Sequence, residues 1–105
     1  MSLFKRMKPS AFLINTARGA IINQTELIEA LQLGLIAGAA LDVLEREPIE
    51  ADSPLLKMDN VILTPHMAWY TEESIRTLQA RVAEEAVRVL KGERPLNLVN
   101  KELYL

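Results

Sequence analysis

The chain has 105 residues, of which half are hydrophobic and a quarter are charged, a composition typical of one folded domain and not of a disordered chain. A formal net charge of -2 excludes the strongly basic surface of nucleic-acid-binding domains, and one histidine with no cysteine excludes disulfides, thiolate metal sites and multi-histidine sites. No apolar stretch approaches the roughly 20 residues that span a bilayer. From the charge, the residue counts and this absence together, we expect a cytoplasmic protein that binds no metal, nucleic acid or membrane.

Three short apolar runs without clean alternation predict β-strands at residues 11–16, 36–43 and 61–64. Such runs are typical of a parallel sheet whose strands are covered on both faces. The segment 45–60 between the last two runs is rich in proline and acidic residues, which predicts a loop with one helical turn near residues 55–57.

A helix is predicted between the first two runs. Asn23 can cap its start, Glu26 can return that bond, and Gly34 can end it. A strand, a helix and a second strand in this order predict a right-handed crossover between parallel neighbours. The fold class is therefore α/β.

A longer helix is predicted from the cap at Thr71 to Lys91, just before Gly92. Its apolar positions recur at helical spacing, at Ile75, Leu78, Val82, Ala86, Val89 and Leu90. Pro95 prevents the helix from continuing, so the tail to residue 105 is expected to be extended or irregular.

Polar residues of useful chemistry follow each predicted strand. They are Thr16, Ala17 and Arg18 after the first, Asp42, Glu45 and Glu47 after the second, and Thr64, Pro65 and His66 after the third. Parallel strands end at one edge of their sheet, and ligands of open α/β sheets bind beyond that edge. Each residue alone has an ordinary explanation, such as a surface arginine, a turn cap or a loop histidine. Their joint placement favours a functional site.

The chemistry available to this set is narrow. Arg18 can bind a carboxylate through two parallel hydrogen bonds, His66 can exchange a proton near neutral pH, and a glutamate can orient that histidine. No serine or cysteine nucleophile accompanies them at this edge, so we expect a redox step on an anionic hydroxy or keto acid, with hydride from a cofactor.

Three motifs resemble one family. NTARG at 15–19, GAALDV with the following EP at 38–48, and NVILTPH at 60–66 are similar to the D-isomer-specific 2-hydroxyacid dehydrogenases, which include D-3-phosphoglycerate and glyoxylate/hydroxypyruvate enzymes. The resemblance covers about residues 7–100. It implies an NAD(P)-dependent oxidoreductase that interconverts small D-2-hydroxy acids and 2-keto acids.

The resemblance also implies a domain organisation. Residues 1–70 would be the C-terminal half of a Rossmann-like NAD(P)-binding domain, with about three parallel strands and helices. Residues 71–105 would be a long helix and tail that return toward a substrate domain.

The resemblance implies roles for individual residues. Arg18 would hold the substrate carboxylate, His66 would be the acid/base, and Glu47 would be the carboxylate partner of that histidine. Asp42 would lie at the nicotinamide end of the cofactor. Further cofactor contacts would come from Thr16, Ala17, Arg18, His66, Met67, Ala68 and Trp69.

One element of the family is absent from the sequence. The four glycines, at positions 19, 34, 38 and 92, do not form the G-x-G-x-x-G turn that holds a cofactor pyrophosphate. The chain therefore resembles the C-terminal third of such an enzyme, and we expect it to be inactive and to bind NAD or NADP weakly or not at all when isolated. Apolar surface left uncovered in such a fragment predicts a homo-oligomer.

An alternative function comes from HMAWYTEES at residues 66–74. This stretch is similar to the C-terminal binding proteins, corepressors built on the same dehydrogenase fold. The alternative is therefore an NAD-sensing binding module that keeps the site residues and acts through contacts.

Overall fold

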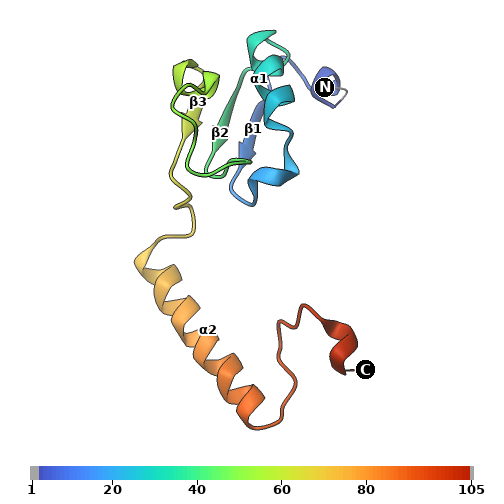
Figure 1. Cartoon of the computed structure of the whole chain (residues 1–105), viewed down its shortest axis with the longest axis vertical. Helices are drawn as coiled ribbons and strands as arrows, with labels where there is room; N and C mark the ends of the chain where they lie inside the picture. The colour runs from blue at the N-terminus through green and yellow to red at the C-terminus, as the bar shows by residue number, and fades with distance from the viewer. Residues whose placement is uncertain (1–2, 105) are drawn as a thin grey trace. The chain divides into compact units, whose positions relative to one another are not determined.

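The computed structural model describes residues 3–104 (Figure 1). The chain forms two compact units, Met1–Ala68 and Trp69–Leu105, and each is described by itself. The first unit holds a sheet and one α-helix, and the second holds one long helix and a tail.

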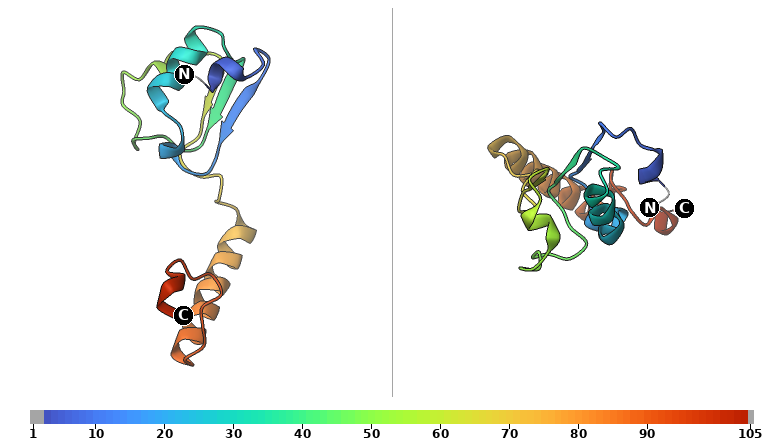
Figure 2. Two further views of the ribbon diagram at one scale, coloured as in Figure 1. Left: turned by 90° about the vertical axis from the view of Figure 1, so that its right-hand side faces the viewer. Right: turned by 90° about the horizontal axis from the view of Figure 1, so that it is seen from above.

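The first unit contains a parallel sheet of three strands. The strands β1 (Phe12–Asn15), β2 (Gly38–Leu41) and β3 (Val61–Leu63) lie in the order β1-β2-β3. The helix α1 (Gln24–Gln32) connects β1 to β2 and packs on one face of the sheet (Figure 2). The predicted α/β fold with three parallel strands is confirmed.

The helix α1 begins and ends where its capping residues predict. The side chain of Asn23 accepts a hydrogen bond from the Glu26 amide at 3.0 Å, which satisfies one of the free donors of the first turn. Gly34 has a φ of 65°, the left-handed conformation that glycine adopts at low cost, and the chain leaves the helix there.

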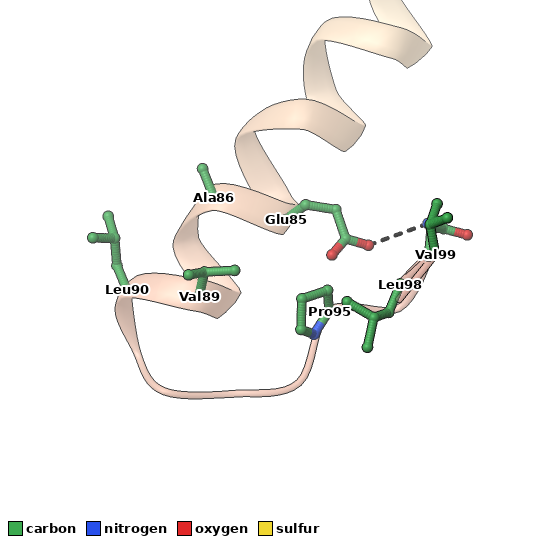
Figure 3. Close-up of a pocket in the computed structure, with 8 residues that line it drawn as sticks. Glu85, Ala86, Val89, Leu90, Pro95, Leu98 and Val99 are labelled. Carbon is green, nitrogen blue, oxygen red and sulfur yellow. Dashed lines mark hydrogen bonds between the residues drawn. The ribbon is translucent and has the colours of Figure 1, made fainter. Parts of the chain in front are cut away.

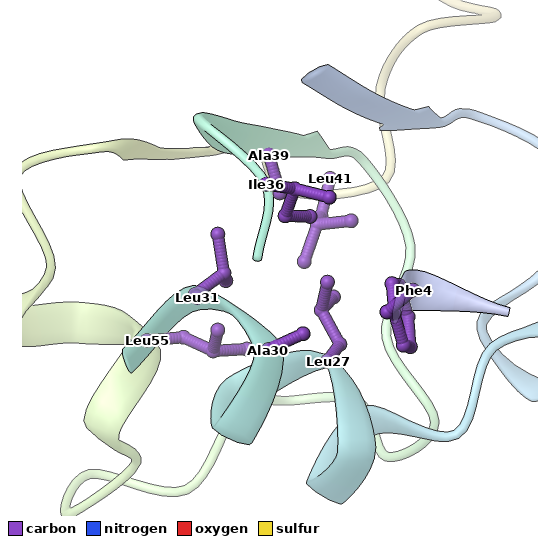
Figure 4. Close-up of a cluster of buried hydrophobic side chains, with 8 residues drawn as sticks. All are labelled: Phe4, Leu27, Ala30, Leu31, Ile36, Ala39, Leu41 and Leu55. Atoms are coloured by element: carbon purple, nitrogen blue, oxygen red, sulfur yellow. The ribbon is translucent and has the colours of Figure 1, made fainter. Parts of the chain in front are cut away.

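The hydrophobic core lies between α1 and the sheet. Figure 4 shows its buried side chains, which are Phe4, Leu27, Ala30, Leu31, Ile36, Ala39, Leu41 and Leu55. Leu55 belongs to a short 3-10 turn, Pro54–Lys57, where the sequence predicts one helical turn inside the long loop. This core fixes the sheet against α1 and so fixes where the strands end.

The opposite face of the sheet is apolar and exposed. Phe12, Ile14 and Ile62 are 68%, 72% and 67% exposed. The expectation that the strands are covered on both faces therefore holds for one face only. Neighbouring residues of a strand point to opposite faces, so the residues that alternate with these three are the ones that contact α1.

The second unit consists of α2 (Glu72–Leu90) and a tail that folds back. Thr71 caps α2 as predicted, because its hydroxyl oxygen accepts from the Ser74 amide at 3.0 Å. The carboxylate of Glu85 accepts from the Leu96 amide at 3.1 Å, which holds the tail beside the last turns of the helix around a hollow of about 630 Å³ (Figure 3). The tail ends in a 3-10 turn, Lys101–Tyr104, where an irregular segment is expected.

Gly19 lies where two segments of backbone approach each other. It begins the 3-10 turn Gly19–Ile21 after β1, and a Cβ added to it would lie 1.9 Å from the carbonyl oxygen of Leu44 and 2.5 Å from the amide nitrogen of Glu45. Only a residue without a side chain fits there, so the loops after β1 and β2 are in direct contact.

We predict that Gly19→Ala destabilises the first unit by about 3 kcal/mol, because backbone atoms, unlike flexible side-chain ends, have little room to yield to the new methyl group. Gly34→Ala is the control, since nothing lies within 4 Å of its Cβ position and only its φ of 65° is unfavourable, a cost of about 1 kcal/mol. Chemical denaturation of both variants gives the two free energies, and an equal loss would contradict the contact.

We also predict that the chain self-associates, because an apolar sheet face carrying Phe12, Ile14 and Ile62 is exposed to water in a single copy. Light scattering measures the mass in solution. A mass near the 11.8 kDa of one chain would show that this face tolerates water.

Candidate active site

The three strands end at one edge of the sheet. Their register pairs Asn15 with Leu41 and Leu41 with Leu63, so the residues that follow each strand start from the same level. This is the edge at which the sequence predicts convergence, and it carries the turns after β1, β2 and β3.

The turn after β1 is held by the side chain of Asn15. Its amide nitrogen donates to the carbonyl of Arg18 at 2.9 Å, and its carbonyl oxygen accepts from the amide of Ala17 at 3.1 Å. The Arg18 side chain is exposed, and its guanidinium donates to the carbonyl of Ala17 at 2.7 Å. The predicted carboxylate-binding residue therefore lies on a turn whose backbone is fixed.

The loop after β2 is tied to the start of α1. The carboxylate of Glu45 accepts from the Gln24 amide at 3.0 Å, and the Glu45 amide donates to the side-chain oxygen of Gln24 at 3.4 Å. Glu45 therefore faces α1, and Glu47 is the glutamate of this loop that reaches the histidine.

Asp42 joins the end of β2 to the segment after β3. One carboxylate oxygen accepts from the Thr64 hydroxyl at 2.6 Å and from the Met67 amide at 2.9 Å, and the other accepts from the Ala68 amide at 2.9 Å. The hydrogen bond from Thr64, more than any other contact, lowers the pKa of Asp42 below its ordinary value. Asp42 is thus a charged and buried anchor for the chain on both sides of His66.

His66 has an unusual backbone conformation. Its φ is 53°, in the left-handed region that residues other than glycine rarely adopt, and such strain is found where surrounding contacts enforce it. Its amide donates to the carbonyls of Asp42 at 2.9 Å and Thr64 at 3.0 Å. These bonds, with those to the Asp42 carboxylate, aim the imidazole toward the loop after β2.

The imidazole of His66 is paired with Glu47. Its Nδ1 lies 2.8 Å from one carboxylate oxygen of Glu47, and the other oxygen accepts from the Leu44 amide at 3.0 Å. The hydrogen bond with His66, followed by that from Leu44, lowers the pKa of Glu47. A carboxylate bound to Nδ1 fixes the orientation of the imidazole ring.

A hollow of about 400 Å³ adjoins this pair. Polar side chains line one part of it and apolar side chains the rest, among them Asp42, Glu47, His66, Leu44, Leu63 and Leu56. The pair is partly exposed, with 44% of the His66 side chain and 38% of the Glu47 side chain accessible, so a small molecule can approach it.

The structure brings most of the predicted site residues together. Asp42, Glu47 and His66 form one hydrogen-bonded group that includes the amides of Met67 and Ala68. Thr16, Ala17 and Arg18 lie on the neighbouring turn at the same edge, and within the described residues the Arg18 side chain donates to Ala17 and not to this group. Trp69 belongs to the second unit, where its ring meets that of Tyr70 edge-on at 5.3 Å.

Two residues of the site, Asn15 and Thr64, carry contacts that sequence reasoning does not assign to them. Their motifs, NTARG and TPH, are visible in the sequence. The role of Thr64 becomes visible only when the strands are paired, because it contacts Asp42 from 22 residues away. The contacts of Asn15 are local, to Ala17 and Arg18, and an asparagine that begins a turn is the signal that could have indicated them.

Neither a metal site nor a membrane segment is found in the described part of the chain. Residues 3–104 contain no group of three or more histidine or acidic side chains placed to hold a metal ion. No helix among the same residues is long and apolar enough to cross a bilayer.

The nicotinamide end of a dinucleotide fits the residues of this edge. Within residues 3–104, Thr64 and Met67 donate to one oxygen of Asp42 and Ala68 donates to the other, which leaves acceptor capacity on the oxygen that Ala68 binds. The pyrophosphate end is different, because the glycine turn that would bind it is not in the sequence.

Residues 1–68 match the family model described as "D-isomer specific 2-hydroxyacid dehydrogenase, NAD binding domain". The glyoxylate reductase of Thermofilum pendens is 50% identical over 99 residues, which are 94% of this chain and 29% of that protein. The D-3-phosphoglycerate dehydrogenase of Archaeoglobus fulgidus is 44% identical over 97 residues, 92% of this chain and 18% of that protein. The chain therefore spans less than a third of the length of these relatives.

Solved structures give the same result. This chain superposes with a TM-score of 0.84, at 39% sequence identity, on the crystal structure of a D-isomer specific 2-hydroxyacid dehydrogenase from Xanthobacter autotrophicus Py2 in complex with NADPH and MES. The match covers 97% of this chain and 41% of that chain. The resemblance predicted from three short motifs is confirmed, and so is the Rossmann-like fold. This chain belongs to the D-isomer specific 2-hydroxyacid dehydrogenase family, and residues 1–68 belong to its NAD-binding domain.

Proposed function

We propose that this chain supplies the acid/base and carboxylate-binding residues of an NAD(P)-dependent enzyme that interconverts small 2-keto acids and D-2-hydroxy acids. The observation that carries the proposal is the pair of His66 and Glu47, 2.8 Å apart at the carboxyl edge of the sheet. A histidine oriented by a carboxylate, with an arginine on the turn after β1 at the same sheet edge, is the set that a keto-acid reduction needs.

In the proposed reduction, Arg18 leaves the carbonyl of Ala17 and binds the substrate carboxylate through two parallel hydrogen bonds. His66, protonated on both nitrogens, donates the Nε2 proton to the keto oxygen as that oxygen gains negative charge. The carboxylate of Glu47 stabilises the imidazolium before the transfer and keeps the ring in place afterwards. In the oxidation the neutral imidazole takes the hydroxyl proton back.

The cofactor, NAD or NADP, supplies or accepts the hydride when it is bound. Asp42 would hold its nicotinamide end, together with Thr16, Ala17 and the segment from His66 to Ala68. The bonds from Asp42 to the amides of Met67 and Ala68 keep part of this segment in a fixed conformation before any ligand arrives.

The proposed activity is that of a longer protein. The relatives provide more than two thirds of their length outside the matched region, and the glycine turn for the pyrophosphate is not in this sequence. We therefore expect the isolated chain to be inactive. A homo-oligomeric state and a cytoplasmic location stay predictions, the first supported by the exposed sheet face.

A chimera tests the proposal directly. The 99 aligned residues of this chain replace their counterpart in the glyoxylate reductase of Thermofilum pendens, with which they share 50% identity. We expect the chimera to oxidise NADH or NADPH in the presence of glyoxylate. A folded chimera that binds the cofactor and reduces nothing would contradict the proposal and favour the corepressor-like alternative.

In this chimera we predict that Arg18→Lys raises KM for glyoxylate by roughly 10- to 100-fold, because an ammonium group is a point charge and does not reproduce the paired bonds of a guanidinium. The Kd of the cofactor should change much less. Arg46→Lys is the matched control, since Arg46 is an exposed arginine of the same unit that pairs with Glu50. Steady-state kinetics on both variants decide it, and an unchanged KM for Arg18→Lys would remove Arg18 from the substrate site.

We predict that Glu47→Gln shifts both pH–rate profiles of the chimera toward lower pH. The lowered pKa of Glu47 keeps it charged at neutral pH, where its charge favours the imidazolium. Glutamine preserves the shape without the charge, so reduction should decline at a lower pH and oxidation should begin at a lower pH. Rates from pH 5 to about 10 measure both limbs.

The matched control for that experiment is Glu45→Gln. Glu45 lies two residues away and bonds to the Gln24 amide, so its loss should leave both limbs in place. Limbs that move in opposite directions, or that move equally in the two variants, would show that Glu47 does not act through His66.

A further inference from the structure

Asn15 is a buried polar residue at the end of β1. It is 4% exposed, and its side-chain amide uses both of its ends on the turn that carries Arg18. Its backbone carbonyl also accepts from the Asp42 amide at 2.9 Å, so Asn15 belongs to the same sheet edge as the His66 group.

We propose that Asn15 is a positioning residue for Arg18: by binding the amide of Ala17 and the carbonyl of Arg18, it fixes the backbone from which the carboxylate-binding side chain projects. The proposal rests on the proposed function of Arg18.

An amide is the side chain that suits this position. The bond to Ala17 needs an acceptor and the bond to Arg18 needs a donor, and asparagine supplies both within one short side chain. Aspartate has the same shape but has no donor, and it would place a negative oxygen against the carbonyl of Arg18. A change of one atom therefore tests the role.

The conformation of Arg18 is fixed from both sides. Asn15 holds the residues before it, and Gly19 after it is packed against the backbone of Leu44 and Glu45. Between them Arg18 is extended, with φ of −149° and ψ of 138°. The direction of its Cα–Cβ bond is therefore set, so less backbone freedom is lost when the side chain binds an anion.

Limited proteolysis tests the local contact in this chain alone. Trypsin cleaves after arginine and lysine when the backbone opens, so cleavage after Arg18, relative to cleavage after Lys57 in the same unit, reports on the turn. We expect Asn15→Asp to raise this ratio roughly tenfold. Asn15→Ser is the second variant, for use if Asn15→Asp does not fold. The serine hydroxyl can make one of the two bonds, so we expect a cleavage ratio between those of the unsubstituted chain and of a chain that has lost both bonds.

Asn60→Asp is the matched control. The side chain of Asn60 also donates to a backbone carbonyl, that of Ala37, at 3.0 Å, but it lies at the start of β3. Its substitution removes the same kind of bond from the other end of the sheet. The ratio should stay within about twofold of the unsubstituted chain, since a loss of global stability exposes both cleavage sites together.

Kinetics of the chimera test the consequence for Arg18. Asn15→Asp should raise KM for glyoxylate, with a smaller change in kcat and an unchanged Kd for the cofactor. The double variant with Arg18→Lys should be no worse than Arg18→Lys alone, because both changes remove the same interaction.

The outcomes separate the two proposals. If Asn15→Asp and Asn60→Asp gave equal cleavage ratios, Asn15 would not hold the turn. If Asn15→Asp raised the ratio but its effect on KM added to that of Arg18→Lys, Asn15 would not act through Arg18. An inactive chimera would overturn the proposed function, and the cleavage ratio would then decide whether Asn15 holds the turn.

Discussion

The carboxylate of Asp42 is the contact on which the conformation of the chain around His66 depends. It collects a hydroxyl and two amides from residues on both sides of His66. Together with the bonds from the His66 amide to the carbonyls of Asp42 and Thr64, that anchor offsets the strain of the left-handed backbone at His66. The pairing of the imidazole with Glu47 therefore follows from a buried charge on the neighbouring strand.

Packing beneath the sheet makes this anchor effective. The core between α1 and the sheet sets the strands level at their carboxyl ends, so residues far apart in sequence meet within hydrogen-bond distance. The close approach at Gly19 then joins the loops after β1 and β2. The site therefore depends on the strand register and on this backbone contact more than on any single motif.

The sequence predicts the features that depend on local pattern. The caps at Asn23 and Thr71 and the three apolar runs placed the helices and strands within a few residues. The contacts of Asp42 and the conformation of His66 could not be predicted in the same way, because they depend on groups brought together by strand pairing. The exposed face around Ile14 contradicts a pattern that suggests burial on both sides. An apolar run shows that a face can be buried, but it does not show which element covers that face.

Different side chains hold the two groups of this edge to which a chemical task is proposed, the guanidinium of Arg18 and the imidazole of His66. The proposed anion-binding arginine sits on a turn held by Asn15, whereas the imidazole is held by Asp42 and Glu47. The side-chain bonds that hold the first turn lie within residues 15–18, and those of the second set lie within residues 42–68. In evolutionary terms, the turn proposed to bind the anion and the pair proposed to transfer the proton are separate modules, each with its own set of side-chain bonds to inherit.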